Sequence, residues 1–263
     1  MDAGKQLLWQ REYRNLVLCS QQPYIVHLAS LTPDNWGPHC LMNGGEMVGM
    51  VMEYIPSLSI REASCIPQWK ASKCVQCVAT LAHGVASLHA LGLIHSDLKP
   101  DNVLIHGSGE FVKIIDLGLA CAAPLGFEWY GTKGYQAPEV QTILPRATRI
   151  RVTGDAGRAA DVWAMGVTSL AMAGGGKSVV AHRQGESKDA MRARQERALL
   201  ELSRDAGRGE CARCRRLWPK DLVAPLGGCV AEGSKMWGTI ALMLGFECGE
   251  RITALAAYEK LTQ

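Results

Sequence analysis

Two carboxylates and an amide flank a predicted β-hairpin near the middle of the chain. Asp97 and Asn102 precede the apolar run Val103–Ile105, and Asp116 directly follows the apolar run Phe111–Ile115. A glycine-rich turn joins the two runs, so the outer ends of the hairpin meet at one edge. A carboxylate can act as a general base, and carboxylate and amide oxygens are ligands that Mg2+ accepts. This combination predicts phosphoryl transfer, which depends on positioning the reactants and neutralising phosphate charge.

The residues around this hairpin resemble the catalytic core of the eukaryotic protein kinase family. The catalytic-loop motif matches at His95, Asp97, Leu98, Lys99, Pro100 and Asn102. Three later motifs follow in the order of the family, namely Asp116-Leu117-Gly118, Ala137-Pro138-Glu139, and Asp161-Val162-Trp163 with Gly166. Ordered matches of this kind are far more specific than a single short motif.

The resemblance implies a role for each polar residue of the loop. Asp97 is expected to accept the proton of a substrate hydroxyl, and Asn102 and Asp116 are expected to bind Mg2+. Lys99 is expected to lie beside the transferred phosphate. Lys99 and Thr132 also resemble the serine/threonine branch of the family. The implied cofactors are therefore ATP and Mg2+, and the implied partner is a protein substrate that carries Ser or Thr.

Further residues are expected, by the same resemblance, to support this centre. The expected members of an apolar stack known as the regulatory spine are Leu16, Leu28, His95 and Leu117. Asp161 is expected to anchor this stack through the backbone of the catalytic loop. Glu139 is expected to form a buried ion pair with Arg251, and loss of one partner from such a pair is costly.

The segment before the loop resembles only part of the small lobe of the family. Lys5–Cys19 has apolar residues at helical spacing and contains Glu12, the expected ion-pairing glutamate of the regulatory helix. Neighbouring Arg11 could take this place if the register shifts, and a solvated surface glutamate is the other alternative. Neither a glycine-rich phosphate loop nor a V-A-I-K lysine precedes this helix. The small lobe is therefore expected to lack its first strands and to expose apolar surface.

A predicted strand, Met47–Met52, leads into the expected hinge between the two lobes. Met52 takes the gatekeeper place, and Glu53 and Tyr54 resemble the hinge, whose backbone receives the adenine edge in this family. Leu104, in the predicted hairpin, is also assigned to the nucleotide site. An ordinary strand and turn is the alternative for this segment, so its assignment depends on the flanking motifs.

The predicted fold is α+β and bilobal, with a complete, mainly helical large lobe. Residues 1–263 are expected to form one domain, with a partial small lobe and hinge at 1–54 and the large lobe at 55–263. Apolar spacing between Trp69 and Leu91 predicts a long helix with one buried stripe. A large-lobe insertion is expected at about 174–235.

The insertion contains a predicted helix and three cysteines. Ser187 predicts the N-cap of the helix. Cys211, Cys214 and Cys229 have zinc-like spacing, but a fourth ligand is not evident, so reduced thiols are the alternative to a zinc site. The arginine-rich stretch Val140–Ala160 is interpreted as a solvated loop, with docking of an acidic substrate as the alternative.

Two substitutions depart from the common pattern of the family. Ser96 replaces the arginine that usually precedes the base, so the chain is of the non-RD type, and Leu117 replaces phenylalanine. The stretch Leu117–Gly131 contains no Ser or Thr. Because the missing arginine pairs with a phosphorylated loop residue in the family, activity is expected not to require phosphorylation of this segment.

Composition narrows the remaining classes of function. A chain of 263 residues with 48% hydrophobic content can form a packed core. A net charge of +3 is too small to indicate nucleic acid or a membrane surface as partner. Ten cysteines without disulfide spacing, and no apolar leader segment, predict a location in the cytoplasm or nucleus.

These observations predict an ATP-dependent serine/threonine protein kinase, impaired here because the glycine-rich loop and the strand lysine are missing. The alternative is a non-catalytic, kinase-like interaction or scaffold module. A zinc-dependent binding protein built on the insertion is a third class. The sequence does not indicate the protein substrate, the pathway or the oligomeric state.

Overall fold

The structure is a computed structural model that describes residues 3–29, 40–43, 46–63, 71–122, 131–143, 154–173, 185–206 and 235–263. Its helices are α1 (Ala3–Leu18), α2 (Ile60–Ala63), α3 (Ala71–Ala90), α4 (Pro138–Ile143), α5 (Gly154–Ala173), α6 (Lys188–Ala206), α8 (Lys235–Met243) and α9 (Ala254–Thr262), with 3-10 helices η1 (Pro100–Asn102) and η3 (Cys248–Glu250). Its strands are β1 (Cys40–Asn43), β2 (Glu46–Met50), β3 (Ser57–Ser59), β4 (Leu93–Ile94), β5 (Val103–His106), β6 (Val112–Ile114) and β7 (Cys121–Ala122). Helices combined with small sheets confirm the predicted α+β class.

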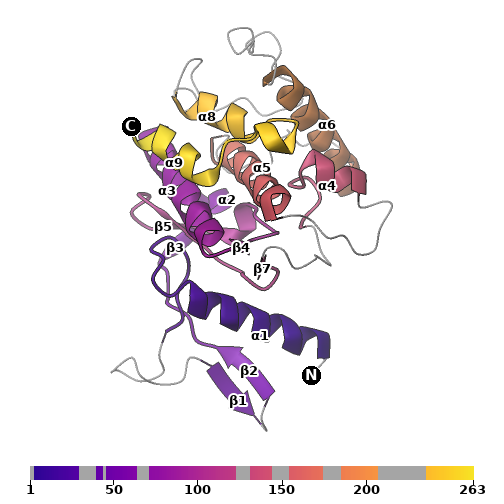
Figure 1. The fold of residues 1–263 in the computed structure, drawn as a ribbon. Coiled ribbons are helices and arrows are strands. Elements are labelled where there is room, and N and C mark those ends of the chain that lie inside the picture. Colours follow the sequence, from indigo (N-terminus) through magenta and orange to yellow (C-terminus); the bar gives the residue numbers. More distant parts are fainter. Residues whose placement is uncertain are drawn as a thin grey trace.

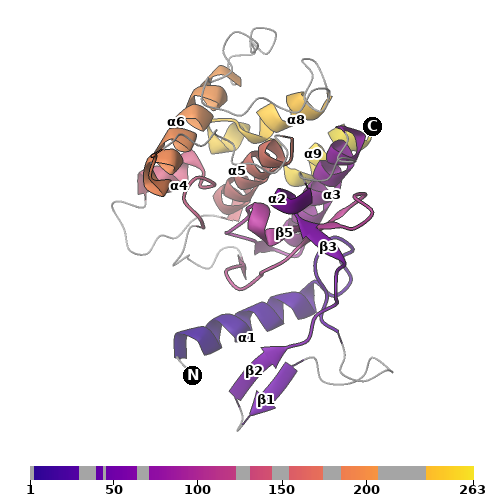
Figure 2. The ribbon, with the colours of Figure 1, turned by 180° about the vertical axis from the view of Figure 1, so that it is seen from behind.

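The elements fall into two parts of unequal size. Figure 1 shows α1 and the β1–β2 hairpin at one end of the molecule, and the helices α3, α5, α6, α8 and α9 at the other. The reverse view in Figure 2 shows the same separation. We call the first part, with residues 24–29, the small lobe, and the part that contains α3 and the later helices the large lobe. The expected loss of the first small-lobe strands stays a prediction.

Backbone hydrogen bonds join the two lobes. The N–H of Val26 donates to the Ile114 carbonyl at 2.9 Å, and the N–H of Ile114 donates to the Tyr24 carbonyl at 2.9 Å. The Asn15 side chain on α1 donates to the carbonyls of Leu117 and Ala120, both at 2.9 Å. Helix α1 is therefore fixed against the segment that follows Asp116.

The interior of the large lobe is built around α5. Every residue from Asp161 to Ala173 is buried, as expected for a helix that is apolar on almost all sides. Gly166 permits close packing, because a Cβ there would lie 2.9 Å from Leu244 Cδ2. The predicted helix between Trp69 and Leu91 is present as α3, which lies beside α9.

The predicted hairpin is present as β5 and β6, which pair antiparallel in the register Val103↔Ile114 and Ile105↔Val112. Strand β3 adds to the outer edge of β5, so the sheet has the order β3-β5-β6. At the turn, Gly109 has a φ of 68°, a conformation that glycine adopts without steric cost. The hairpin places the end of β6 next to the start of β5.

Part of the expected insertion is described as α6. The Ser187 hydroxyl accepts a hydrogen bond from the Ala190 N–H at 3.2 Å, which confirms the predicted N-cap. The cysteines at 211, 214 and 229 lie outside the described residues, as do positions 144–153 of the arginine-rich stretch. None of the helices in the described ranges is long and apolar enough to span a bilayer.

Candidate active site

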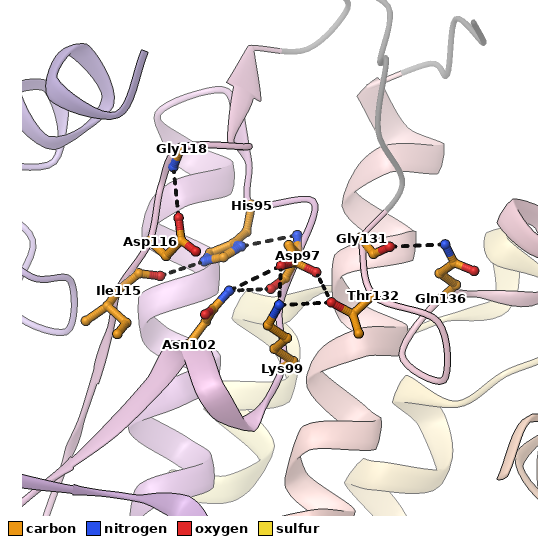
Figure 3. Close-up of polar contacts among 10 residues, drawn as sticks. All are labelled: His95, Asp97, Lys99, Asn102, Ile115, Asp116, Gly118, Gly131, Thr132 and Gln136. Atoms are coloured by element: carbon orange, nitrogen blue, oxygen red, sulfur yellow. Dashed lines mark hydrogen bonds and ion pairs between the residues drawn. The ribbon is translucent and has the colours of Figure 1, made fainter. Parts of the chain in front are cut away.

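The carboxylate of Asp97 is held from two sides by Lys99 and Thr132 (Figure 3). Lys99 Nζ lies 2.6 Å from Asp97 Oδ2, and the Thr132 hydroxyl donates to Asp97 Oδ1 at 2.8 Å. Lys99 Nζ also donates to the Thr132 hydroxyl oxygen at 2.9 Å. These contacts hold the Asp97 carboxylate in one orientation, and only 7% of the residue is exposed to solvent. Residues far apart in the sequence therefore meet at the expected base.

Asn102 lies beside the same carboxylate because η1 turns the chain back. Its N–H donates to the Lys99 carbonyl at 3.0 Å, which closes the turn that Pro100 begins. The Asn102 side-chain Nδ2 donates to the backbone oxygen of Asp97 at 2.9 Å and lies 3.5 Å from Asp97 Oδ2. Because the amide nitrogen is used in this way, Oδ1 is the Asn102 atom that could bind a cation.

Asp161, on α5, holds the backbone of the catalytic loop. Its carboxylate is 2% exposed and accepts hydrogen bonds from the N–H of His95 at 2.7 Å and of Ser96 at 2.9 Å. Ser96 has a φ of 71°, which costs a residue other than glycine about 1–2 kcal/mol. The two charge-assisted bonds offset this strain. A third contact, from His89 Nε2 at 3.1 Å, was not predicted, because nothing in the sequence distinguishes His89 from other polar residues of α3.

His95 joins the catalytic loop to the strand that leads to Asp116. Its Nδ1 accepts a hydrogen bond from the Asp97 N–H at 3.3 Å, so Nε2 carries the proton and donates to the Ile115 carbonyl at 3.2 Å. His95 is completely buried. The ring therefore fixes the distance between the loop and the end of β6.

Asp116 and Asn102, the two residues expected to bind Mg2+, lie at adjacent ends of the hairpin. The N–H of Ile115, which directly precedes Asp116, donates to the Asn102 carbonyl at 3.0 Å. Asp116 has a φ of 62° and is exposed, and its Oδ1 accepts a hydrogen bond from the Gly118 N–H at 3.4 Å (Figure 3). The hairpin thus brings the two residues together.

Glu12, on α1, lies close to Asp116. Burial raises the pKa of the Glu12 carboxyl, the charge of Asp116 raises it further, and a hydrogen bond from the Leu117 N–H acts in the opposite direction. Among the side chains that the structure describes, no lysine or arginine forms an ion pair with Glu12. Two neighbouring carboxylates repel each other, so this end of the site suits a cation such as Mg2+.

The residues expected to contact adenine lie on the connection between the lobes and on β5. Met52 is 42% exposed and Tyr54 is 89% exposed, while Leu104 on β5 is half-buried. Met52 forms a bridge with Leu28, and the N–H of Glu53 donates to the His27 carbonyl at 3.0 Å. These bonds fix the course of the backbone at the expected hinge.

Lys113 supports this connection from β6 and was missed by the sequence analysis. Its Nζ lies 2.7 Å from Glu53 Oε1 and donates to the Ile25 carbonyl at 3.2 Å. Burial tends to raise the pKa of Glu53, but hydrogen bonds from Lys113 and the His27 N–H hold it below its usual value. A lysine within the apolar run of β6 was the available signal, because a buried charge needs a partner.

The four expected spine residues are all at least partly buried. Leu16, His95 and Leu117 are completely buried, and Leu28 packs against the core. The Asn15 amide, next to Leu16, donates to the Leu117 carbonyl. Helix α1 therefore contacts the segment after Asp116 through Asn15, and the neighbouring Leu16 belongs to the same buried core as Leu117.

Arg251 and Glu139 form the expected ion pair. The two guanidinium nitrogens lie 2.6 Å from the two carboxylate oxygens, and the Arg251 side chain is completely buried. Arg251 also donates to the carbonyls of Ala159, Gly245 and Phe246 at 3.0, 2.8 and 3.1 Å. The pair connects the start of α4 with the segment before α9.

A partly open pocket lies next to Asp97. Thr132 and Tyr135 line it, together with Ala160 and Ala164 on α5. The small side chains of α5 leave this space open. In the described parts of the chain, no group of three or more His, Cys, Asp or Glu residues is placed to hold a metal ion.

Known proteins with similar sequences are kinases. A family model described as "Protein kinase domain" matches residues 3–260. The chain is 34% identical to the putative cyclin-dependent kinase F-2 of Oryza sativa subsp. japonica over 142 residues, which is 50% of this chain and 41% of the relative. It is 40% identical to the serine/threonine-protein kinase ksp1 of Schizosaccharomyces pombe over 92 residues, 33% of this chain and 18% of the relative.

A bacterial protein shows similarity of the same order. The serine/threonine-protein kinase PknG of Mycobacterium leprae is 31% identical over 134 residues, which is 49% of this chain and 17% of the relative. The chain thus matches less than half the length of each of these three curated relatives.

Proposed function

The chain belongs to the protein kinase family, and from this premise we propose that it is an ATP-dependent serine/threonine protein kinase whose phosphoryl transfer is slow in the chain as it stands. The observation that carries the proposal is the fixed carboxylate of Asp97, which contacts Lys99 and Thr132 in a residue that lines a pocket. The serine/threonine kinases among its relatives support the choice of substrate hydroxyl.

Asp97 is the proposed general base. It orients the substrate hydroxyl and accepts its proton, while Lys99 and Thr132 hold the carboxylate in place. Lys99 Nζ, 2.6 Å from Asp97 Oδ2, also places a positive charge where the transferred phosphate would lie. In this proposal, the chain contributes to phosphoryl transfer a positioned proton acceptor, Asp97, and a fixed positive charge, Lys99.

Asn102 Oδ1 and the Asp116 carboxylate are the proposed ligands of Mg2+. Bound Mg·ATP would supply the phosphoryl group and a cation that neutralises its charge. Asn102 and Asp116 lie at adjacent hairpin ends, and Glu12 places a second carboxyl group near Asp116. The backbone around Met52, Glu53 and Tyr54, with Leu104, is the proposed adenine side.

The proposed weakness lies at Glu12. In the family, this glutamate pairs with a strand lysine that contacts the phosphates. Among the residues that the structure describes, no lysine pairs with Glu12. One charge-assisted contact contributes about 1.5–3 kcal/mol, so its loss would slow transfer roughly tenfold to more than a hundredfold. We expect slow transfer to a protein with Ser or Thr, in the cytoplasm or nucleus.

Transfer of radiolabelled phosphate from Mg·ATP to a generic serine/threonine protein substrate tests the proposal. We expect slow incorporation that Asp97→Asn abolishes and that Asp101→Asn, which alters an exposed neighbouring carboxylate, leaves unchanged. Incorporation that survives Asp97→Asn would contradict the role of Asp97.

A non-catalytic interaction module is the second candidate. The isolated charge of Glu12 and the exposed apolar residues of α1, Leu7 and Leu18, favour it. A protein that binds Mg·ATP or partner proteins but transfers no phosphate under any tested condition would support this candidate over the enzyme.

A further inference from the structure

Helix α6 contacts the loop beside the candidate active site through two consecutive residues. Gln195 Nε2 donates to the Gly134 carbonyl at 2.8 Å, and the Gly134 N–H donates to Glu196 Oε1 at 3.1 Å. Both polar groups of one glycine are thus bound by side chains of a helix more than sixty residues away, with separations of 61 and 62. In both ribbon views α6 lies next to α4, which follows the Gly134 loop (Figures 1 and 2).

The contact is specific to glycine and is buried. Gly134 has a φ of 93°, and a Cβ at this position would lie 3.2 Å from Gln195 Nε2. Gln195 is 4% exposed. A buried donor or acceptor that loses its partner cannot replace it with water, so these two bonds restrain the loop strongly.

Helix α6 is itself fixed next to this contact. Arg194, which directly precedes Gln195, is 4% exposed and binds both carboxylate oxygens of Glu186, at 2.9 and 2.6 Å. On the following turn, Ala198 and Leu199 are buried in the core. Gln195 and Glu196 therefore project from a helix that is anchored on both sides of them.

Gly134 lies in the middle of a turn that contributes to the pocket beside Asp97. Two residues earlier, Thr132 donates to the Asp97 carboxylate, and the N–H of Tyr135 donates to the Thr132 carbonyl at 3.1 Å. Tyr135 and Gln136 line the pocket, and Gln136 Nε2 donates to the Gly131 carbonyl (Figure 3). Movement of Gly134 would therefore move the wall of the pocket.

We propose that Gln195 and Glu196 are positioning residues that hold the loop 131–136 as the docking wall for a polypeptide substrate next to Asp97. This inference rests on the proposed kinase function for the identity of the substrate. Thr132 has its own bonds to Asp97 and Lys99, so loss of the α6 contact should weaken peptide docking more than the chemical step. Because α6 belongs to the expected insertion, the insertion would act on substrate binding and not on phosphoryl transfer.

The test compares the parent with variants that each remove or keep one hydrogen bond between α6 and Gly134. Gln195→Glu keeps the shape but removes the donor to Gly134, and Glu196→Ala removes the acceptor. Glu196→Gln keeps a carbonyl oxygen that can accept from Gly134, and Arg197→Ala changes an exposed neighbour on α6, so both are controls.

Two readouts separate docking from catalysis. Hydrogen exchange of the peptide that contains residues 131–136 reports the restraint without requiring activity. An array of serine- and threonine-containing peptides, first scored for bound protein and then for phosphate transfer, gives binding and peptide KM. We expect faster exchange and roughly tenfold weaker peptide binding in Gln195→Glu and Glu196→Ala. The KM for ATP and kcat should change less than about twofold, and both controls should match the parent.

Each result that differs from these expectations would overturn a specific part of the proposal. Unchanged exchange in both disruptive variants would overturn the restraint. Faster exchange with unaltered peptide binding, or a parent that binds no peptide on the array, would overturn the docking role. A parent that binds peptides but transfers no phosphate would refute the proposed kinase activity, while the binding data would still decide whether α6 holds the docking wall.

Discussion

Asp97 in the large lobe and Glu12 in the small lobe are both acidic, yet their surroundings are opposite. Asp97 contacts a lysine at 2.6 Å and a hydroxyl at 2.8 Å, and its loop is held from α5. Glu12 has the Asp116 charge close by, and burial and that charge both raise its pKa. The difference shows that the side of the candidate site with the proposed base Asp97, the base side, has its charges paired. Near Glu12, the structure describes no paired cation.

The same contrast appears in packing. Thirteen consecutive residues of α5 are buried, from Asp161 to Ala173. On α1, by contrast, Leu7 is 56% and Leu18 is 57% exposed, and these residues lie about three turns apart on one face. Met42 on β1 is 56% exposed. Within the described residues, the large lobe has the continuous buried helix, and its most exposed large apolar residue is Leu255 at 54%. The small lobe has several such residues on α1 and β1, and the predicted cause, missing strands, stays a prediction.

The largest expected effect is on the stability of the large lobe. Arg251→Ala should lower the free energy of unfolding by about 3–5 kcal/mol, because it leaves Glu139 and three carbonyls without a buried guanidinium. Arg158→Ala removes an ion pair to Asp155, which is 94% exposed, and should cost less than about 0.5 kcal/mol. Urea unfolding followed by circular dichroism measures both. If Arg251→Ala does not fold, Arg251→Lys serves instead, and equal midpoints for Arg251→Lys and Arg158→Ala would contradict the proposed importance of the buried pair.

The next effect concerns Mg·ATP. Asp116→Ala should weaken Mg·ATP binding at least roughly tenfold, since it removes one of two proposed metal ligands. Calorimetric titration of the parent and the variant measures the affinity, and Asp101→Ala provides an exposed carboxylate as control. The positive φ of Asp116 makes alanine somewhat strained there, so circular dichroism must show an intact fold. Equal affinities in a folded variant would rule out Asp116 as a ligand.

A smaller effect is expected for Glu12→Gln, which should make the fold more stable, not less. Because its folded-state pKa is raised above the ordinary 4.5, the carboxyl stabilises the fold below the unfolded pKa, and this contribution is lost as pH rises through the folded pKa. Glu12→Gln, which resembles the protonated form, should therefore raise the melting temperature at pH 7 by an amount equivalent to less than about 1 kcal/mol. Below about pH 4 the parent and variant should converge. A variant that is less stable at pH 7 would indicate that Glu12 already has a cationic partner.

The smallest expected effect is that of phosphatase treatment. Ser96 stands where the family has the arginine that pairs with a phosphorylated loop, and Leu117–Gly131 contains no Ser or Thr. Activity before and after treatment should agree within about twofold, a difference of less than 0.5 kcal/mol in the barrier. Loss of activity together with phosphate mapped to Tyr130 or Thr132 would contradict this expectation.

Much of the large lobe could be predicted from sequence because its signals are local. The β5–β6 hairpin follows from two apolar runs and a glycine-rich turn, and α3 follows from its apolar stripe. The pairing of Glu139 with Arg251 was expected only through the family resemblance, since it joins residues distant in the chain.

The partners in the contacts that were missed can be identified only from tertiary structure. The partner of Lys113, Glu53, is distant in the chain, and Gln195 and Glu196 have no distinguishing sequence pattern, although they contact Gly134 in the fold. Positive φ at Ser96 and Asp116 also has no sequence signal, because neither residue is glycine. The possible zinc ligands Cys211, Cys214 and Cys229 lie outside the described residues and stay a prediction.

The most direct test of the contrast between the lobes measures phosphate transfer from Mg·ATP by the parent, Asp97→Asn and Glu12→Gln in one assay. If the base side is complete and Glu12 lacks a lysine, Asp97→Asn abolishes the slow transfer and Glu12→Gln changes it less than about twofold, which is below 0.5 kcal/mol. Loss of activity in Glu12→Gln as severe as that in Asp97→Asn would show that Glu12 has a functioning lysine partner, and the account of the small lobe would be wrong.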